Sequence, residues 1–157
     1  MELKPPTMHN ADFAIRVLEV ADPEVARELD ELMEHLAPAP RPRLTRERLE
    51  RIISSPYATL FVAELEGRIV GSLTLQRYTT PVADKFWIED VVTLPEVRGR
   101  GVGRALLKEA IRMARQITPE GTIYLTSNPH RTAARELYRS EGFEQYETGV
   151  FRLPGKQ

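Results

Sequence analysis

The apolar positions in the N-terminal third of the chain recur at helical intervals. Residues 13–20 (FAIRVLEV) favour a β-strand, and Asp22-Pro23 then offers a helix N-cap followed by proline at the first helical position. After it, apolar residues spaced three and four apart predict an amphipathic helix: Val25, Leu29, Leu32, Met33 and Leu36. A second short helix is predicted between Thr45 and Pro56, because its apolar residues also share one face.

The middle of the chain reads as strands. Residues 58–78 form two β-prone runs joined by Glu66-Gly67, which predicts a hairpin. In residues 84–94, alternate positions are nearly all apolar on both faces of the predicted strand, as in a central strand of a sheet. The remaining pattern predicts a helix that ends before Pro119 and Gly121, a strand at 122–127, a helix from Asn128-Pro129 to Ser140 and a closing strand at 149–153.

These elements follow one another in the order β-α-α-β-β-β-α-β-α-β. That order predicts an α/β (α+β) fold in which helices flank a mixed central β-sheet. We find no repeat, linker or low-complexity segment, so residues 12–154 are predicted to form one domain, preceded by a flexible polar arm at residues 1–11.

Composition narrows the classes of function. The 157 residues carry a formal net charge of −1, which gives no basic field for nucleic acid. The chain has no Cys, and its three His are scattered, so we expect no disulfide, no thiolate nucleophile and no metal site. Residues 1–10 lack the features of a secretory signal and no apolar run is long enough to span a membrane, so the expected location is the cytoplasm.

The stretch RGRGVGRA (98–105) joins the predicted central strand to a helix. Helix N-termini carry unpaired N–H groups and a partial positive charge, and glycine lets a ligand approach the backbone closely. Gly99, Gly101 and Gly103 alternate with arginines here, which predicts a phosphate or pyrophosphate site. The spacing fits neither a Walker loop, which ends in Lys-Ser/Thr, nor a dinucleotide fingerprint.

At this point the chain resembles a known family. Arg98-x-x-Gly101-x-Gly103 is similar to the (Q/R)-x-x-G-x-(G/A) signature of the GCN5-related N-acetyltransferase family. The hairpin before it, the strand WIEDVVTLPE and the later Tyr-x-x-x-Gly-Phe ending at Tyr138 resemble the family in the same order. The resemblance extends over residues 13–153.

The resemblance implies an enzyme that transfers the acetyl group of acetyl-CoA directly to a primary amine in a ternary complex, without a metal. It implies that Tyr138 protonates the departing thiolate and that Arg131, where many members have Asn, contacts the cofactor. It also implies that one strand pairs with the pantetheine arm and that the signature loop holds the pyrophosphate; the residues at those positions are Val91, Val92, Thr93, Arg98, Gly99, Arg100, Gly101, Val102, Gly103 and Arg104.

Two carboxylates interrupt the apolar strand before the signature. In a regular strand Glu89 and Asp90 point to opposite faces. Glu89 shares its face with Trp87 and Thr93, so we predict Glu89 as the catalytic base. Asp90 is predicted to be structural, with an arginine or backbone partner among aliphatic neighbours, and a β-bulge would exchange the two faces.

The sequence alone leaves open two functions from other classes of protein. One is a non-catalytic acyl-CoA-binding or sensor module on the same fold, and another is a phosphate-loop nucleotide hydrolase, which lacks its lysine here. Tyr138 could also serve only in packing. The expected partner is a small-molecule or peptide amine, without nucleic acid or membrane, and a homodimer is compatible with the sequence.

Overall fold

The computed structural model describes residues 8–10 and 12–156, which fall into two compact units, residues 1–126 and 127–157. The first unit contains a six-stranded sheet in which each strand pairs with its neighbour in the chain. All pairs are antiparallel except the last, which is parallel. The strands are β1 (Met8–Asn10), β2 (Phe13–Val17), β3 (Ala58–Leu65), β4 (Arg68–Thr79), β5 (Asp84–Thr93) and β6 (Thr122–Leu125).

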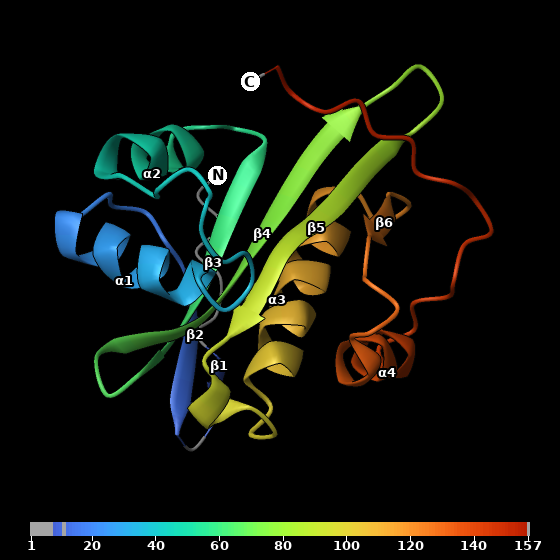
Figure 1. The fold of residues 1–157 in the computed structure, drawn as a ribbon. Coiled ribbons are helices and arrows are strands. Elements are labelled where there is room, and N and C mark those ends of the chain that lie inside the picture. Colours follow the sequence, from blue (N-terminus) through green and yellow to red (C-terminus); the bar gives the residue numbers. More distant parts are fainter. Residues whose placement is uncertain (1–7, 11, 157) are drawn as a thin grey trace. The chain divides into compact units, whose positions relative to one another are not determined.

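Helices cover both faces of this sheet (Figure 1). Helices α1 (Pro23–Met33) and α2 (Arg46–Ile53) pack on one face, and α3 (Val102–Ile117) packs on the other, next to Gly71 of β4. The predicted cap at Asp22 is confirmed, because its carboxylate accepts from the amide of Glu24, and the Thr45 hydroxyl caps α2 by accepting from the amide of Arg48. The mixed sheet flanked by helices confirms the predicted fold class.

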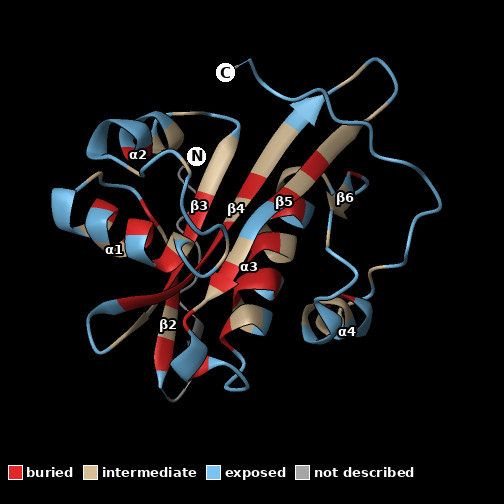
Figure 2. Ribbon diagram, in the orientation of Figure 1, coloured by how far each residue is buried: buried red, intermediate tan, exposed pale blue. Residues whose placement is uncertain are grey.

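The core lies between the sheet and its helices, where the ribbon of Figure 2 is red. Phe61, Leu73 and Phe86 of the sheet are fully buried, as are Leu106 and Leu107 of α3. A Cβ on Gly71 would come within 3.0 Å of Val102, so the absence of a side chain there lets α3 lie close against the sheet. This contact holds the N-terminus of α3 beside the end of β5.

Two helices differ from the sequence prediction at their ends. Helix α1 ends at Met33, so Leu36 lies in the turn that follows it. In the second unit, α4 spans Thr132–Ser140 and begins later than Asn128-Pro129. The Asn128 side chain instead accepts a hydrogen bond from the amide of His130, which forms a turn of its own before the helix.

The closing strand predicted at residues 149–153 does not form. Residues 143–156 have no regular secondary structure, and Val150, Phe151 and Leu153 are exposed. A strand needs a hydrogen-bonded partner, and no described strand pairs with this segment. Its alternating apolar pattern is therefore not sufficient to make it a strand.

The predicted N-terminal arm is described in part. Residues 8–10 form β1, whose Met8 and Asn10 pair with Ile15 and Phe13 of β2. Residues 1–7 and 11 lie outside the described residues. Among the described residues, no helix is long and apolar enough to cross a membrane.

Candidate functional site

The signature loop leaves β5 through a short 3-10 turn, η1 (Pro95–Val97), and enters α3. Gly99 and Gly101 have φ angles of 79° and 84°, in the left-handed region that favours glycine. Gly101 is the N-cap of α3, and no side chain caps the helix. No side chain therefore occupies the N-terminus of α3, where helix N–H groups can bind an anion.

The loop also has the open space that a phosphate requires. A Cβ built on Gly99 or on Gly101 would meet no atom within 4 Å. Arg98, Arg100 and Arg104 are exposed around this opening, and Arg100 lies 3.5 Å from the Asp12 carboxylate. Gly103 differs from the other two glycines, because it lies inside the first turn of α3. Open backbone and exposed arginines at a helix N-terminus are features that suit an anion such as a phosphate.

Strands β5 and β6 pair over only part of their length. Their parallel register runs from Lys85 to Ile88 of β5 and does not continue to Val91, Val92 and Thr93 among the described residues. On the other edge of β5, Val92 and Thr93 pair with Ser72 and Gly71 of β4. The sheet is thus split next to the residues that the resemblance assigns to the pantetheine arm.

A β-bulge interrupts β5 at the two carboxylates. Glu89 pairs with Thr74 and Val92 pairs with Ser72, so two residues of β5, Asp90 and Val91, stand opposite one residue of β4. Asp90 has a φ angle of 53°, which matches such a bulge. The regular alternation assumed from the sequence is wrong here.

The bulge corrects two predictions about these side chains. Directly paired residues share a face, so Glu89 lies on the side of Thr74, whereas Thr93 lies on the opposite side with Gly71. Asp90 is exposed rather than buried among aliphatic residues, and no arginine is recorded as its partner among the described residues. Glu89 is exposed too, and Asp90 lines the same cavity as Thr74.

The two carboxylates affect each other's titration. Partial desolvation, together with the negative charge of the adjacent Asp90, raises the pKa of Glu89 above its ordinary value of 4.5. A carboxylate with a raised pKa holds a proton more firmly, which suits a general base. The bulge therefore places this candidate base opposite Thr74, a residue that lines a cavity.

That cavity has a volume of about 220 Å³ and lies between the α1–α2 region and the sheet. Apolar side chains make most of its wall: Leu29, Met33, Leu36, Ala37, Pro42, Leu44, Ile52 and Leu60. Its polar lining consists of Arg41, Arg48, Thr74 and Asp90. The sequence analysis did not identify these residues as one group.

The wall of the cavity depends on Asp30, which the sequence analysis missed. Asp30 is 3% exposed, and its carboxylate accepts from Arg41 and from the amide of Leu44 while pairing with Arg43. Burial opposes ionisation, but these hydrogen bonds and positive charges lower the pKa of Asp30 below 3.8. The available signal was an aspartate beside Leu29 in the helix, followed by a loop rich in arginine.

Tyr138 and Arg131 belong to the second unit. Tyr138 is buried in α4 and meets Phe143 edge-to-face at 6.2 Å between ring centroids. Desolvation raises the pKa of Tyr138 above 10.0, and the positive charge of Arg131 partly opposes this rise. The phenol is therefore protonated at neutral pH.

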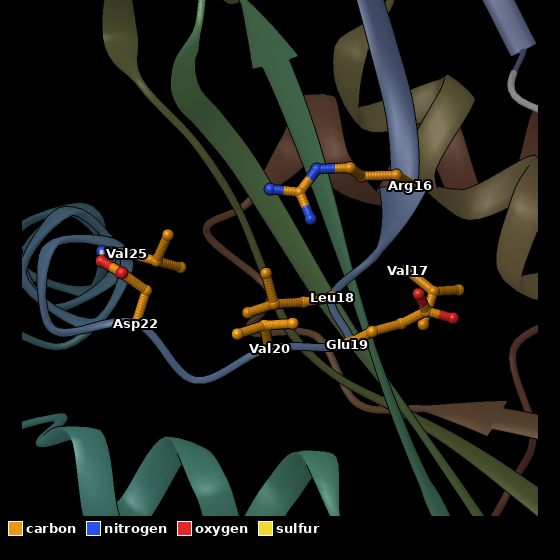
Figure 3. A pocket seen from close by; sticks show the side chains of 7 residues that line it. All are labelled: Arg16, Val17, Leu18, Glu19, Val20, Asp22 and Val25. Atoms are coloured by element: carbon orange, nitrogen blue, oxygen red, sulfur yellow. Dashed lines mark hydrogen bonds between the residues drawn. The ribbon is translucent and has the colours of Figure 1, made fainter.

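A second cavity, of about 350 Å³, lies at the junction of β2 and α1 (Figure 3). Its lining comes from the end of β2, the following link and the first turn of α1, and it contains none of the predicted site residues. Its one arginine, Arg16, is paired with Glu64 at 2.6 Å. Elsewhere, no group of three or more His, Cys, Asp or Glu within the described residues is placed to hold a metal ion.

Comparisons with known proteins show the family and the fold of this chain. The N-alpha-acetyltransferase RimI of Mycobacterium tuberculosis is 32% identical over 95 residues, which are 60% of this chain and 58% of that protein. The matches span less than two thirds of each of the curated relatives considered. A putative acetyltransferase from Agrobacterium tumefaciens str. C58 is 30% identical with a TM-score of 0.77, over 90% of this chain and 99% of that one.

An aminoglycoside N-acetyltransferase, AAC(6')-Iy, in complex with CoA shares the fold with a TM-score of 0.75 at 18% identity, over 93% of this chain and 97% of that one. The family model for the Acetyltransferase (GNAT) family matches residues 27–143. That match covers the hairpin, the signature loop and the Tyr138 region. The chain therefore belongs to the GNAT family of acetyltransferases, a family that uses acetyl-CoA.

Proposed function

We propose that the protein is an N-acetyltransferase that moves the acetyl group of acetyl-CoA directly to a primary amine in a ternary complex. The observation that carries this proposal is the uncapped N-terminus of α3, bordered by Gly99 and Gly101 in open left-handed conformations. The similarity to an N-alpha-acetyltransferase supports nitrogen as the acceptor atom.

In this proposal the chain binds acetyl-CoA mainly through its backbone. Residues 98–104 hold the pyrophosphate at the start of α3, where the helix dipole and three arginines favour negative charge. Residues 91–93 hydrogen-bond the pantetheine arm where the pairing of β5 with β6 has ended. Arg131 contributes a positive charge to a phosphate.

The chemical step needs a free amine and a protonated leaving group. Glu89 takes a proton from the acceptor ammonium, directly or through one water, and the amine lone pair then attacks the thioester carbonyl carbon. The C–N bond forms, the C–S bond breaks, and the thiolate leaves with the electron pair. Tyr138 gives its proton to that sulfur. The nitrogen then loses a second proton, which returns to Tyr138 through solvent.

A substitution in the signature loop tests this proposal. Gly101→Val places a branched side chain in the space that the pyrophosphate would use, so we expect the affinity for CoA to fall by 10-fold or more in calorimetry. Gly67→Val is the matched control. Gly67 has a φ of 77°, and a Cβ built on it would also meet no atom within 4 Å, but it lies in the β3–β4 hairpin.

Both variants carry the same kind of backbone strain. If CoA affinity falls only in Gly101→Val, a general loss of stability does not explain the effect. Unchanged CoA affinity in Gly101→Val would overturn the loop assignment. CoA binding without consumption of the thioester, across a panel of amines, would instead favour a non-catalytic acyl-CoA sensor.

A further inference from the structure

The cavity between the α1–α2 region and the sheet has an uneven distribution of charge. Arg41 lines it, but the Arg41 guanidinium is already paired with Asp30 at 2.8 Å and with Glu34 at 2.9 Å. Arg48 also lines the cavity, and its guanidinium has no hydrogen bond or ion pair with any described residue. One positive charge is therefore available to a ligand.

Two further polar groups on the wall lack partners within the described part of the chain. Arg41 has a buried Nε–H donor that finds no acceptor. Asp90 is exposed at the bulge and brings a negative charge to the same cavity. A buried donor without an acceptor is destabilising, and a ligand oxygen would relieve it. The wall thus offers donors for an anion and a carboxylate for a cation.

The rest of the wall is apolar, and the cavity is small. Eight aliphatic or proline side chains surround these polar groups. The volume of about 220 Å³ lies below the roughly 300–1,000 Å³ typical of sites for drug-sized ligands. A polycationic sugar is too large for this space, and it would bring its positive charges next to Arg48.

We propose that the acceptor is a small α-amino acid with an apolar side chain, of about the size of leucine. Its ammonium group lies at Asp90, its side chain against the aliphatic wall, and its carboxylate on Arg48 with the Arg41 Nε–H nearby. This assignment rests on the proposed N-acetyltransferase function and adds the class of its acceptor. The product is an N-acetyl amino acid and CoA.

The order of groups in the cavity agrees with the chemical step. Thr74 lines the cavity and pairs across the strands with Glu89, so the candidate base lies on the cavity side of the sheet. An ammonium group at Asp90 is therefore adjacent to Glu89, which removes its proton. Acetylation neutralises the nitrogen, so the product loses its attraction to Asp90.

Acceptor kinetics test the proposal with the full chain and acetyl-CoA. Leucine is compared with isopentylamine, which lacks the carboxylate, with leucinamide, which lacks the negative charge, and with a leucine-initiated tripeptide. We expect leucine to have a kcat/KM about 10- to 100-fold above the other three, the usual scale of a charged hydrogen-bonded pair. In Arg48→Gln that ratio should fall to near one.

Arg51→Gln is the matched control, because Arg51 lies on the same helix, is exposed and does not line the cavity. It should retain the wild-type preference. Calorimetry of N-acetyl-leucine gives a readout independent of turnover, and its affinity should fall in Arg48→Gln but not in Arg51→Gln.

Preference for the tripeptide or for leucinamide would overturn the amino-acid assignment in favour of a peptide N-terminus, while leaving an N-acetyltransferase. An equal effect of Arg48→Gln on all four acceptors would likewise overturn it. If CoA does not bind in calorimetry, the proposed function fails first and this inference fails with it.

Discussion

At the scale of single residues, the β-bulge sets the positions of the two carboxylates of β5. A regular strand would send Glu89 and Asp90 to opposite faces, whereas at the bulge both are exposed, Asp90 lines the cavity and Glu89 pairs with Thr74, which also lines it. The proximity of two negative charges makes ionisation of Glu89 less favourable. Its carboxylate is therefore the group whose titration we expect in the pH profile.

Removing this carboxylate tests its role as the base. Glu89→Gln should lower kcat by about 100-fold, the scale of one acid–base group, and should abolish the fall in rate at acidic pH. Wild-type activity should decrease as the pH falls through the raised pKa of Glu89, since the base is then protonated. Steady-state rates between pH 5 and pH 9 check this expectation.

The same variant makes a prediction about stability with a defined sign. A raised pKa means that the folded state holds the proton more firmly, so the wild-type unfolding free energy falls as the pH rises from 4.5 through that pKa. Glu89→Gln should thus be slightly more stable at pH 7 and equal below pH 4.5. Asp90→Asn is the control for rate, and a larger loss of kcat there would exchange the two roles.

Tyr138 combines burial with a protonated hydroxyl. Tyr138→Phe keeps the ring and its edge contact with Phe143, so the melting temperature should change little. Turnover should fall by about 100-fold because the thiolate leaves without its acid. Tyr146→Phe, in an exposed tyrosine of the same unit, is the control. Full activity of Tyr138→Phe would leave Tyr138 with a packing role.

At the scale of elements, one carboxylate fixes a loop to a helix. The chain between α1 and α2 has no regular structure, yet its residues 41–44 form part of the cavity wall. Asp30 holds this loop through Arg41, Arg43 and the amide of Leu44. The shape of the cavity therefore depends on the ionisation of Asp30, although Asp30 does not line the cavity.

Asp30→Asn should lower the unfolding free energy by about 3 kcal/mol at pH 7, because it breaks a buried ion pair. The lowered pKa of Asp30 stabilises the fold above pH 3.8, and this contribution is lost as the pH falls through the folded-state pKa. The difference between variant and wild type should thus shrink in denaturation at pH 3. Glu31→Gln, which breaks an exposed pair with Arg27, should cost less than 1 kcal/mol. Equal losses in the two variants would contradict the special role of Asp30.

At the scale of the whole molecule, local signals predicted most elements and the cofactor loop. Asp22, Thr45, Glu66-Gly67 and the glycines at 99 and 101 act within a few residues of themselves, so the sequence was sufficient to place them. The bulge at Asp90 depends on the register with β4, which no local pattern contains.

The remaining differences have the same physical origin. The segment 149–153 alternates like a strand, but pairing requires a partner from elsewhere in the chain. The cavity joins residues from five elements and one loop, separated by up to about sixty positions in the sequence. Contacts of this kind arise only once the chain has folded, so the acceptor class could not be inferred before the structure.

The bare glycines of the signature loop also bear on how such a protein can diverge. In the proposed function their role depends on main-chain N–H groups and on the absence of side chains, so most substitutions at these two positions should weaken the binding of the cofactor. The cavity that we propose for the acceptor is built instead from side chains of α1, α2, the loop between them and strands β3, β4 and β5. In this proposal, substitutions in residues 29–52 of that wall should change the preferred amine and leave the binding of the acetyl donor intact, which makes this segment the natural region for directed evolution.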